Sequence, residues 1–229
     1  MIEVNSFTGK GKRENNEDYI LSHQLSPDCS FFLVADGMGG YSFGEIASSL
    51  ACESIAEYLI VNYEKSKIKW LLSNSLSIAN ENINKKRKEL AVKMGTTIAG
   101  VIIEGSRAYL FWVGDVRIYQ FRNNEILFQS EDHSLISEMK KKGNVSAKEI
   151  ERYGNIVTRS LSGILMEEAT EIIELSLIPE DIIILCTDGF WQNVNVSSVI
   201  NLPIEDIQNK INTNGKNMDD NYSFLKICY

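Results

Sequence analysis

Residues 96–129 read TTIAGVIIEGSRAYLFWVGDVRIYQFRNNEILFQ, and this stretch decides the fold class. β-branched and aromatic side chains dominate it, and it is interrupted by turn signals such as Glu104-Gly105-Ser106 and Asn123-Asn124. Short runs of this composition between tight turns are typical of antiparallel strands. The stretch therefore predicts a β-meander, with strands at 96–104, 107–113, 116–122 and 125–129.

Two long helical patterns lie before the meander. In residues 43–62 the apolar side chains fall on one face, and in residues 66–91 they recur at spacings of three and four. Strands, then a helix pair, then further strands indicate an α+β fold with helices on the outer faces of antiparallel sheets. No linker interrupts the chain, so we expect one domain over residues 1–229. The other expected elements are strands at 2–8, 18–25, 30–36, 155–162, 171–175, 181–187 and 222–228, and helices at 134–142, 146–152 and near 203–212.

Composition limits the classes of function. The chain has 229 residues, of which 44% are apolar and 24% charged, and its net charge is -8. An acidic chain is a poor candidate for binding nucleic acid or an anionic membrane surface. No apolar run approaches the roughly 18 residues that span a bilayer, and residues 1–5 do not resemble a signal peptide. We therefore expect a cytoplasmic protein with no nucleic-acid partner and no membrane partner.

Aspartates recur where predicted strands end. One apolar run leads directly into Asp36-Gly37 and another into Asp188-Gly189. Asp115 follows a third such run, and Asp220 stands just before the last predicted strand. A single Asp-Gly after a strand is usually only a turn. Four such positions favour a shared site, and because gathered carboxylates repel one another unless cations lie between them, they predict a hard-metal site with oxygen ligands.

The stretch Arg13-Glu14-Asn15-Asn16-Glu17-Asp18 is a second dense polar cluster. It fits either a solvated hairpin turn or an arginine that faces an anion beside carboxylates that orient water. Arginine suits phosphate because its planar guanidinium donates two parallel hydrogen bonds. Four aspartates contribute about −4 and two divalent cations about +4, so that Arg13 would leave such a site positive. Charge counting therefore favours a phosphate substrate, whose hydrolysis metal ions promote by activating water and polarising the phosphoryl oxygens.

The order of these motifs resembles the protein phosphatase 2C (PPM) family of metal-dependent Ser/Thr phosphatases, and in particular its bacterial members. The matching elements are, in order, Arg13-Glu14-Asn15-Asn16-Glu17-Asp18, Val34-Ala35-Asp36-Gly37-Met38-Gly39-Gly40, Gly95-Thr96-Thr97, Val113-Gly114-Asp115-Val116-Arg117, Asp132-His133-Ser134, Val157-Thr158-Arg159-Ser160-Leu161, Thr187-Asp188-Gly189 and Asp220-Asn221. Each motif alone is common, but eight in the right order are specific. The resemblance covers essentially the whole chain and implies a four-layer α-β-β-α sandwich, in which helix pairs flank a central antiparallel β-sandwich.

The resemblance also implies the metal ligands. Asp36 would bridge two Mn²⁺ or Mg²⁺ ions, helped by the carbonyl of Gly37. Asp188 and Asp220 would complete the ligands of this pair. Asp115, together with Asp188, would serve a third and weaker metal.

The roles of the remaining site residues follow from the same resemblance. Arg13 would hold the substrate phosphate, while Glu17 and Asp18 would act through metal-bound waters. Arg13, Asp18 and Asp36 would be the catalytic residues, and metal-bound hydroxide would attack phosphorus in line without a phosphoenzyme. The implied partners are phosphoprotein substrates and a cognate Ser/Thr kinase, and we expect a monomer.

The chain departs from the family pattern at several positions. Met38 stands where eukaryotic members carry a histidine proposed as general acid, so the leaving group must take its proton from water or another group. Val116 replaces the usual serine, and Gly11 lies one residue closer to Arg13 than is common. The stretch between Asp188 and Asp220 is short. Residues 134–154 occupy the place of a flap beside the active site, where we expect variable substrate contacts.

Two other interpretations stay open. A non-catalytic module of this fold could bind a phosphoprotein or regulate a kinase, but such proteins usually lose one or more metal aspartates, and all are present here. A related branch dephosphorylates anti-sigma-factor antagonists in partner-switching pathways. That branch shares the metal aspartates but commonly lacks the N-terminal R-x-x-N-E-D motif that this chain carries.

Overall fold

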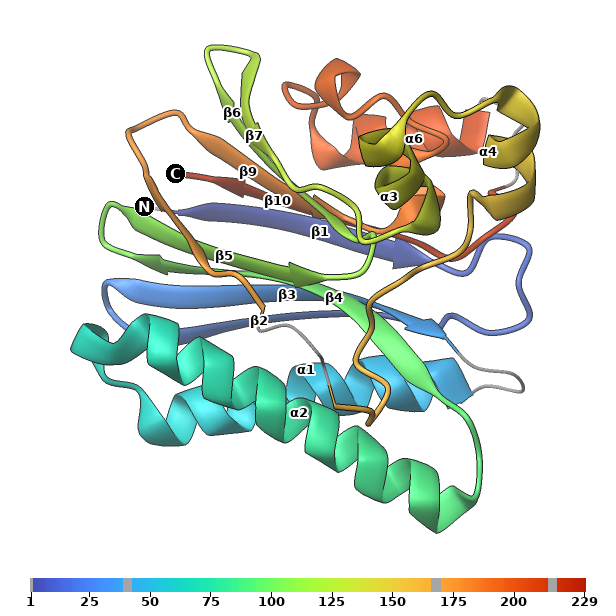
Figure 1. Ribbon diagram of the computed structural model, residues 1–229. Coiled ribbons are helices and arrows are strands. Elements are labelled where there is room, and N and C mark those ends of the chain that lie inside the picture. Colours follow the sequence, from blue (N-terminus) through green and yellow to red (C-terminus); the bar gives the residue numbers. More distant parts are fainter. Residues whose placement is uncertain (1, 39–42, 166–169, 214–217) are drawn as a thin grey trace.

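Two antiparallel five-stranded sheets pack face to face in the computed structural model, which describes residues 2–38, 43–165, 170–213 and 218–229 (Figure 1). The first sheet has the order β1 (Glu3–Gly9), β10 (Tyr222–Cys228), β9 (Ile182–Cys186), β6 (Arg117–Arg122) and β7 (Glu125–Gln129). The second has the order β2 (Asp18–Ser26), β3 (Cys29–Met38), β4 (Gly95–Glu104), β5 (Arg107–Val113) and β8 (Ile173–Ser176).

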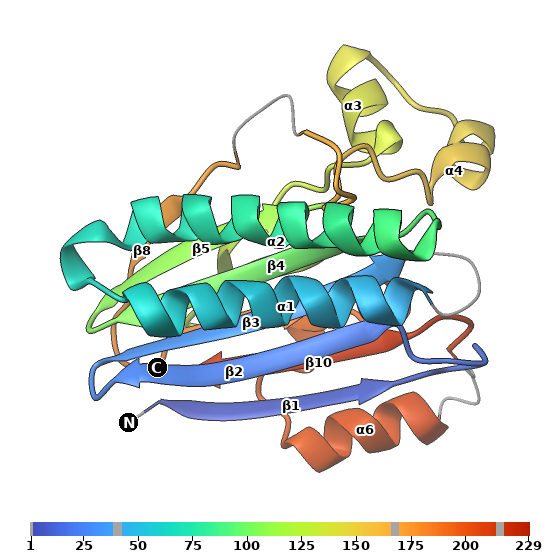
Figure 2. The ribbon, with the colours of Figure 1, turned by 90° about the horizontal axis from the view of Figure 1, so that it is seen from below.

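Helices form the two outer layers. The outer face of the second sheet is covered by α1 (Phe43–Asn62) and α2 (Ile68–Leu90), which the short η1 (Lys65–Lys67) connects (Figure 2). The first sheet is covered by α5 (Asp188–Trp191), η2 (Val196–Ser198) and α6 (Ile204–Thr213). A small pair, α3 (Leu135–Lys142) and α4 (Ala147–Tyr153), lies above one end of the sandwich (Figure 1). The predicted α+β fold with four layers is confirmed.

Strand β3 is buried on both faces, as its unbroken apolar run indicates. Phe31 and Leu33 point into the core beneath α1 and α2, whereas Phe32 and Val34 point between the sheets. This two-sided packing holds the strand rigidly. Its last residues, which include Asp36, are therefore presented at a fixed place at one end of the sandwich.

The expected strand at 155–162 is wrong. This segment is a loop that pairs with other segments only at single positions, Val157 with Ser134 and Leu161 with Thr96. Side chains of α2 hold it further along, because Asn80 bonds the backbone at Gly163 and Ile164 and Arg87 donates to the carbonyl oxygen of Ser162. Its β-branched residues lie extended, but no neighbouring strand completes a ladder.

Two short elements were missed. Helix α5 contains four residues and η2 contains three. Neither is long enough to produce a repeating apolar pattern. Within the described residues, no helix combines the length and apolarity that crossing a membrane requires.

Candidate metal centre

The strand register brings carboxylates from distant segments to one end of the sandwich, at the right of Figure 1. Asp18 faces Asp36 directly in the β2–β3 ladder. Asp188 is the first residue of α5, with only Thr187 between it and β9, and Asp220 lies just before β10. Asp115 occupies the turn between β5 and β6. The structure therefore places all the aspartates that the sequence singled out at the same end.

These carboxyl groups change one another's protonation. Burial, followed by repulsion from Asp18, Asp188, Asp115 and Asp220, raises the pKa of Asp36 well above its ordinary value. Burial and the charges of Asp188 and Asp220 raise the pKa of Asp18 to about 7, against hydrogen bonds from Ser223 and Thr187 that lower it. Burial and the charge of Asp188 also raise the pKa of Asp115 to about 7. Burial and mutual repulsion therefore oppose ionisation of the whole group, and added positive charge would favour it.

Two carboxylate oxygens at this end have no protein partner. Oδ1 of Asp18 and Oδ1 of Asp188 are buried and accept no hydrogen bond among the described residues. The second oxygen of Asp18 accepts a hydrogen bond from Thr187 at 2.9 Å. Buried oxygens are normally hydrogen-bonded, and carboxylate oxygens are the preferred ligands of Mg²⁺ and Mn²⁺. The donor set therefore fits hard divalent cations.

The set does not form a closed cage in this arrangement. No three His, Cys, Asp or Glu side chains in the four described ranges converge to hold one metal ion. Asp220 is turned toward Arg13, whose guanidinium donates to its Oδ2 at 2.7 Å. The side chains of Arg13 and Asp220 remain 59% and 41% exposed, so this ion pair lies at the rim of the site.

The loop that carries Arg13 is fastened by one buried side chain. Nδ2 of Asn221 donates to the carbonyl oxygens of Lys10 and Asn15 at 2.9 and 2.8 Å. Its Oδ1 accepts from the backbone N–H of Glu17 at 2.8 Å. Asn221 therefore holds residues 10–17 beside Asp220. The sequence motif named Asn221, but nothing in the sequence showed what it binds.

Close backbone packing joins the end of β3 to the start of α1. The N–H of Gly37 donates to the carbonyl oxygen of Glu17 at 3.0 Å, and Ser48 donates to the same oxygen at 2.6 Å. A Cβ on Gly37 would lie 2.1 Å from the carbonyl oxygen of Gly44, so no other residue fits there. A Cβ on Gly44 would lie 2.6 Å from the carboxyl carbon of Glu17. Gly44, which sequence reasoning missed, leaves the space that the Glu17 carboxyl occupies.

Neither Met38 nor His133 can supply a proton to a leaving group at pH 7. Met38 is the last residue of β3 and carries no acidic hydrogen. His133 accepts a hydrogen bond at Nδ1 from the Gly114 N–H, and its ring stacks on Trp112 at 6.0 Å. Burial, with the charges of Arg159 and Lys141, lowers the pKa of His133 to about 4, so the ring is neutral at pH 7. The motif residues Gly39 and Gly40 lie outside the described residues.

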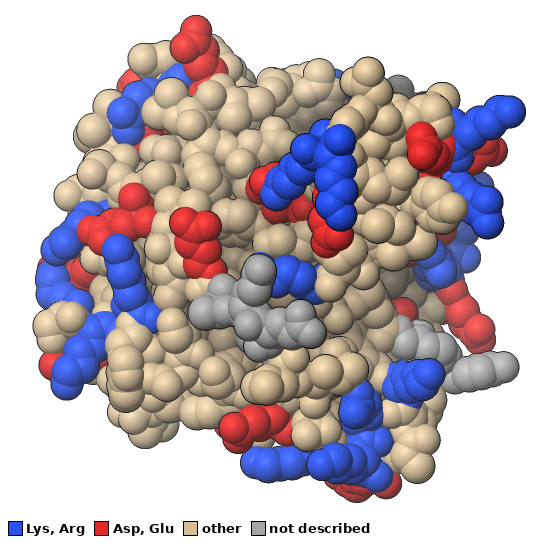
Figure 3. Space-filling view, in the orientation of Figure 1, with Lys and Arg blue, Asp and Glu red and all other residues tan. Residues whose placement is uncertain are grey.

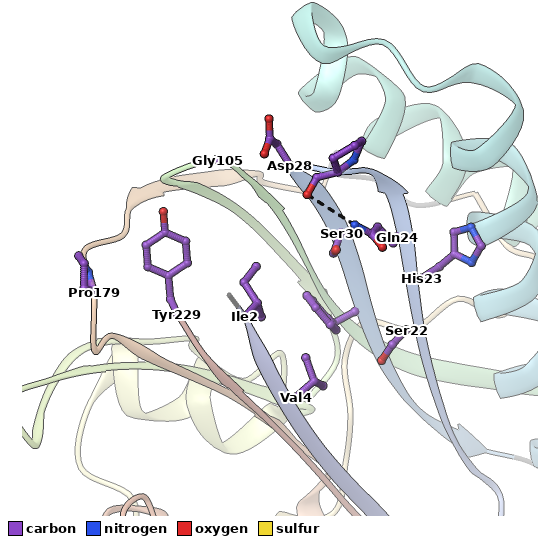
Figure 4. A pocket seen from close by; sticks show the side chains of 12 residues that line it. Ile2, Val4, Ser22, His23, Gln24, Asp28, Ser30, Gly105, Pro179 and Tyr229 are labelled. Atoms are coloured by element: carbon purple, nitrogen blue, oxygen red, sulfur yellow. Dashed lines mark hydrogen bonds between the residues drawn. The ribbon is translucent and has the colours of Figure 1, made fainter.

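A separate cavity of about 760 Å³ opens at the opposite end of the sandwich (Figure 4). Ile2, Val4 and Phe32 line it between the sheets, with Asp28 and Tyr229 at its edge. None of the clustered aspartates lines it. In this protein the arrangement of charge, rather than cavity size, indicates the site.

Surface charge on the face in Figure 3 is divided into small groups. Lysines and arginines there mostly stand beside acidic side chains. Among the ion pairs of the described residues, Nζ of Lys141 lies 3.0 Å from Oε1 of Glu131. Neutralised groups of this kind produce no extended field of one sign. This face therefore offers no continuous basic surface for a polyanion.

Comparison with known proteins identifies the family. The family model described as Protein phosphatase 2C matches residues 10–220, which include every clustered aspartate. This chain belongs to the protein phosphatase 2C family. Protein phosphatase PhpP of Streptococcus pneumoniae is 28% identical over 215 residues, which cover 90% of this chain and 86% of that protein. Serine/threonine phosphatase stp of Listeria monocytogenes is 27% identical over 196 residues, which cover 82% of this phosphatase 2C chain and 77% of the relative.

Solved structures agree with this family fold. The serine/threonine phosphatase of S. agalactiae superposes with a TM-score of 0.83 at 26% identity and covers 100% of this chain and 99% of its own. The catalytic domain of the phosphatase PstP, solved in complex with two manganese ions, gives a TM-score of 0.84 at 22% identity, with coverages of 99% and 97%. The second likeness supports the phosphatase 2C fold alone.

Proposed function

We propose that this phosphatase 2C protein hydrolyses phosphoserine and phosphothreonine in proteins at a centre that binds two Mn²⁺ or Mg²⁺ ions. The observation that carries the proposal is the group of mutually repelling aspartates with unpartnered buried oxygens beside an exposed arginine. Relatives named Ser/Thr phosphatases and a structural neighbour with two manganese ions support it. Residues 1–229 would form one catalytic domain, and a Ser/Thr kinase would supply the phosphorylated substrates.

The metal ligands would come from the strand ends. Asp36 and the carbonyl of Gly37 would hold both ions, with Asp188 and Asp220 as further ligands. Asp115 and Asp188 would share a third ion. When bound, the ions supply positive charge that polarises the phosphoryl group and activates water.

Arg13 would position the substrate. Its guanidinium has five N–H donors, and among the described residues the hydrogen bond to Asp220 engages only its Nη2. The exposed rim position allows a phosphate to approach from solvent. Glu17 and Asp18 would accept hydrogen bonds from water in the site and orient it for attack. Because Met38 cannot donate a proton, the leaving hydroxyl would take its proton from water or from another group.

The test compares phosphopeptide turnover with Mn²⁺ and with excess EDTA in wild type and Asp36→Asn. We expect turnover only in the wild type with metal. Asp28→Asn is the matched control, since Asp28 is exposed at the opposite end of the sandwich. Full activity in EDTA, or in Asp36→Asn, would rule out the proposed centre.

A further inference from the structure

Three side chains form a stack between the Asp115 turn and the start of the segment that leads into α3. The guanidinium carbon of Arg117 lies 3.4 Å from the centroid of the Trp191 ring. On its edge, Arg117 makes two parallel hydrogen bonds to Asp132, with Nε to Oδ1 at 2.8 Å and Nη2 to Oδ2 at 2.7 Å. The side chains of Arg117 and Asp132 are only 21% and 13% exposed. We call Trp191, Arg117 and Asp132 the 191–117–132 stack.

The stack joins two of the clustered aspartates. Trp191 ends the short helix α5 that Asp188 begins. Its indole Nε1 donates to the carbonyl oxygen of Asp115 at 3.1 Å. One side chain of α5 therefore fixes the backbone of Asp115, while the first residue of the same helix presents the Asp188 carboxylate.

The Asp115 turn is also held from its other side. Gly114 and His133 exchange hydrogen bonds, since the His133 N–H donates to the Gly114 carbonyl at 2.8 Å and Nδ1 accepts the Gly114 N–H at 3.1 Å. A Cβ on Gly114 would lie 2.4 Å from Thr97, and its φ is +110°. Close packing of Gly114 on Thr97 limits movement of the turn toward β4. Its freedom to move away from Asp188 is limited by Trp191 and by the ion pair of Arg117 with Asp132.

We propose that the 191–117–132 stack is a positioning device that sets the separation of Asp115 from Asp188, and so the affinity for a divalent cation that the two share. The inference rests on the proposed function. Two like-charged carboxylates repel, and a ligand pair without support would move apart when the cation leaves. Groups that orient ligands commonly change metal affinity by about 10- to 100-fold when they are removed.

The alternative is that Trp191 contributes only packing contacts and does not position Asp115. Trp191→Phe distinguishes the two, because it keeps an aromatic ring beneath Arg117 and removes the N–H that holds Asp115. Asp132→Asn tests the other end of the stack, because it removes one of the two carboxylate oxygens that hold Arg117. The charge of Asp132 also acts on Asp115, so Trp191→Phe is the more specific of the two variants. Trp70→Phe is the matched control, because Trp70 lies on α2 with 58% of its surface exposed.

The measurement is a titration with Mn²⁺ alone, followed by the electron paramagnetic resonance signal of the free ion. Asp115→Asn identifies the weak class of sites. We expect Trp191→Phe to raise the dissociation constant of that class by about 10-fold and Asp132→Asn by about 3-fold, with the tight class unchanged. Trp70→Phe should match wild type.

The inference is overturned if both stack variants bind the weak class within twofold of wild type while Asp115→Asn loses it. It is also overturned if the variants weaken both classes equally, because that result indicates general loss of structure. Failure of the proposed function is a different result, namely Mn²⁺ binding that Asp36→Asn leaves unchanged.

Discussion

The pKa values of buried carboxyl groups are shifted in opposite directions at the two ends of the β-sandwich. Asp181, at the end that holds the 760 Å³ cavity, is fully buried and accepts two hydrogen bonds from Arg122 at 2.7 Å each, with others from Gln120 and the Ile178 N–H. Burial alone would raise its pKa, but these partners lower it. At the other end, Asp18 and Asp115 are 6% and 7% exposed, and their pKa values are raised to about 7.

Glu104 confirms the pattern at the first end. It is 3% exposed, accepts a hydrogen bond from Tyr63 and pairs with Lys65 at 2.5 Å. Structural carboxylates in this fold thus come with protein partners that cancel the cost of burial. At the other end, one oxygen of Asp18 and one of Asp188 have no such partner among the described residues, which is the physical reason to assign this group to cations.

The largest effect should come from Asp36→Asn. Loss of the ligand that both metals would share should lower turnover of a phosphopeptide by about 10³-fold or more, since charge stabilisation by the metals is the main source of rate. The metal-free variant should also melt higher than metal-free wild type, because a repelling carboxylate is gone. Steady-state kinetics and thermal melting check the two parts. A melting temperature that falls would show that Asp36 is a structural acid like Asp181.

Asp181→Asn should lower the melting temperature and leave turnover unchanged, in contrast to Asp36→Asn. The change leaves the Arg122 guanidinium without its two carboxylate oxygens, so the melting temperature should fall by about 5 °C while turnover per folded molecule stays unchanged. Differential scanning calorimetry measures the first quantity and initial rates the second. Loss of turnover at full folding would contradict the division between the two ends.

The stability of the metal-free protein should depend on pH in the direction set by the raised pKa values. Asp18 and Asp115 hold their protons more tightly when folded than when unfolded. Their contribution to stability is therefore complete below the unfolded pKa of about 4 and is lost as pH rises through about 7. Melting in EDTA should shift down between pH 5 and pH 8, and excess Mn²⁺ should abolish the shift. Melting curves at four pH values in both solutions supply the check.

The smallest effect should come from Met38→His. A histidine at this position can donate a proton to a leaving group, so turnover of a phosphoserine peptide should rise by up to about 10-fold. Turnover of p-nitrophenyl phosphate should stay within twofold, because its leaving group needs no proton. A pH–rate profile with a new limb near the histidine pKa would support this role for position 38, and equal effects on both substrates would speak against it.

Much of the fold could be predicted from the sequence because its periodic segments are long. The two helices of residues 43–62 and 66–91 and the four strands of 96–129 lie within a few residues of α1, α2 and β4 to β7. The single meander expected for 96–129 is wrong, because β4 and β5 belong to the second sheet whereas β6 and β7 belong to the first. The expected strand at 155–162 failed for a tertiary reason. Its composition fits an extended chain, but α2 and single contacts hold it, and no composition reveals whether a neighbouring strand is present.

For the candidate site, too, one part could be predicted from the sequence and another part could not. Three of the aspartates could be located because Asp36, Asp115 and Asp188 each follow an apolar run, and Asp220 because it precedes one. The strand register places Asp36 opposite Asp18. The contacts of the residues that hold them could not be predicted. Asn221 binds backbone about 210 positions away, and Trp191 reaches Asp115 across 76 positions, so neither leaves a local pattern. The pairing of Arg13 with Asp220 was likewise unexpected, since the sequence indicated only an anion for Arg13.

The central claim is that the clustered aspartates bind divalent cations with release of their protons. Calorimetric titration with Mn²⁺ measures both the metal binding and the proton release of the metal-free protein. The titration is done at pH 6 and pH 8, in buffers of different ionisation enthalpy. We predict at least two ions per chain, with more protons released at pH 6 than at pH 8, and loss of this binding in Asp36→Asn. Absence of binding, or binding without proton release at pH 6, would contradict the account.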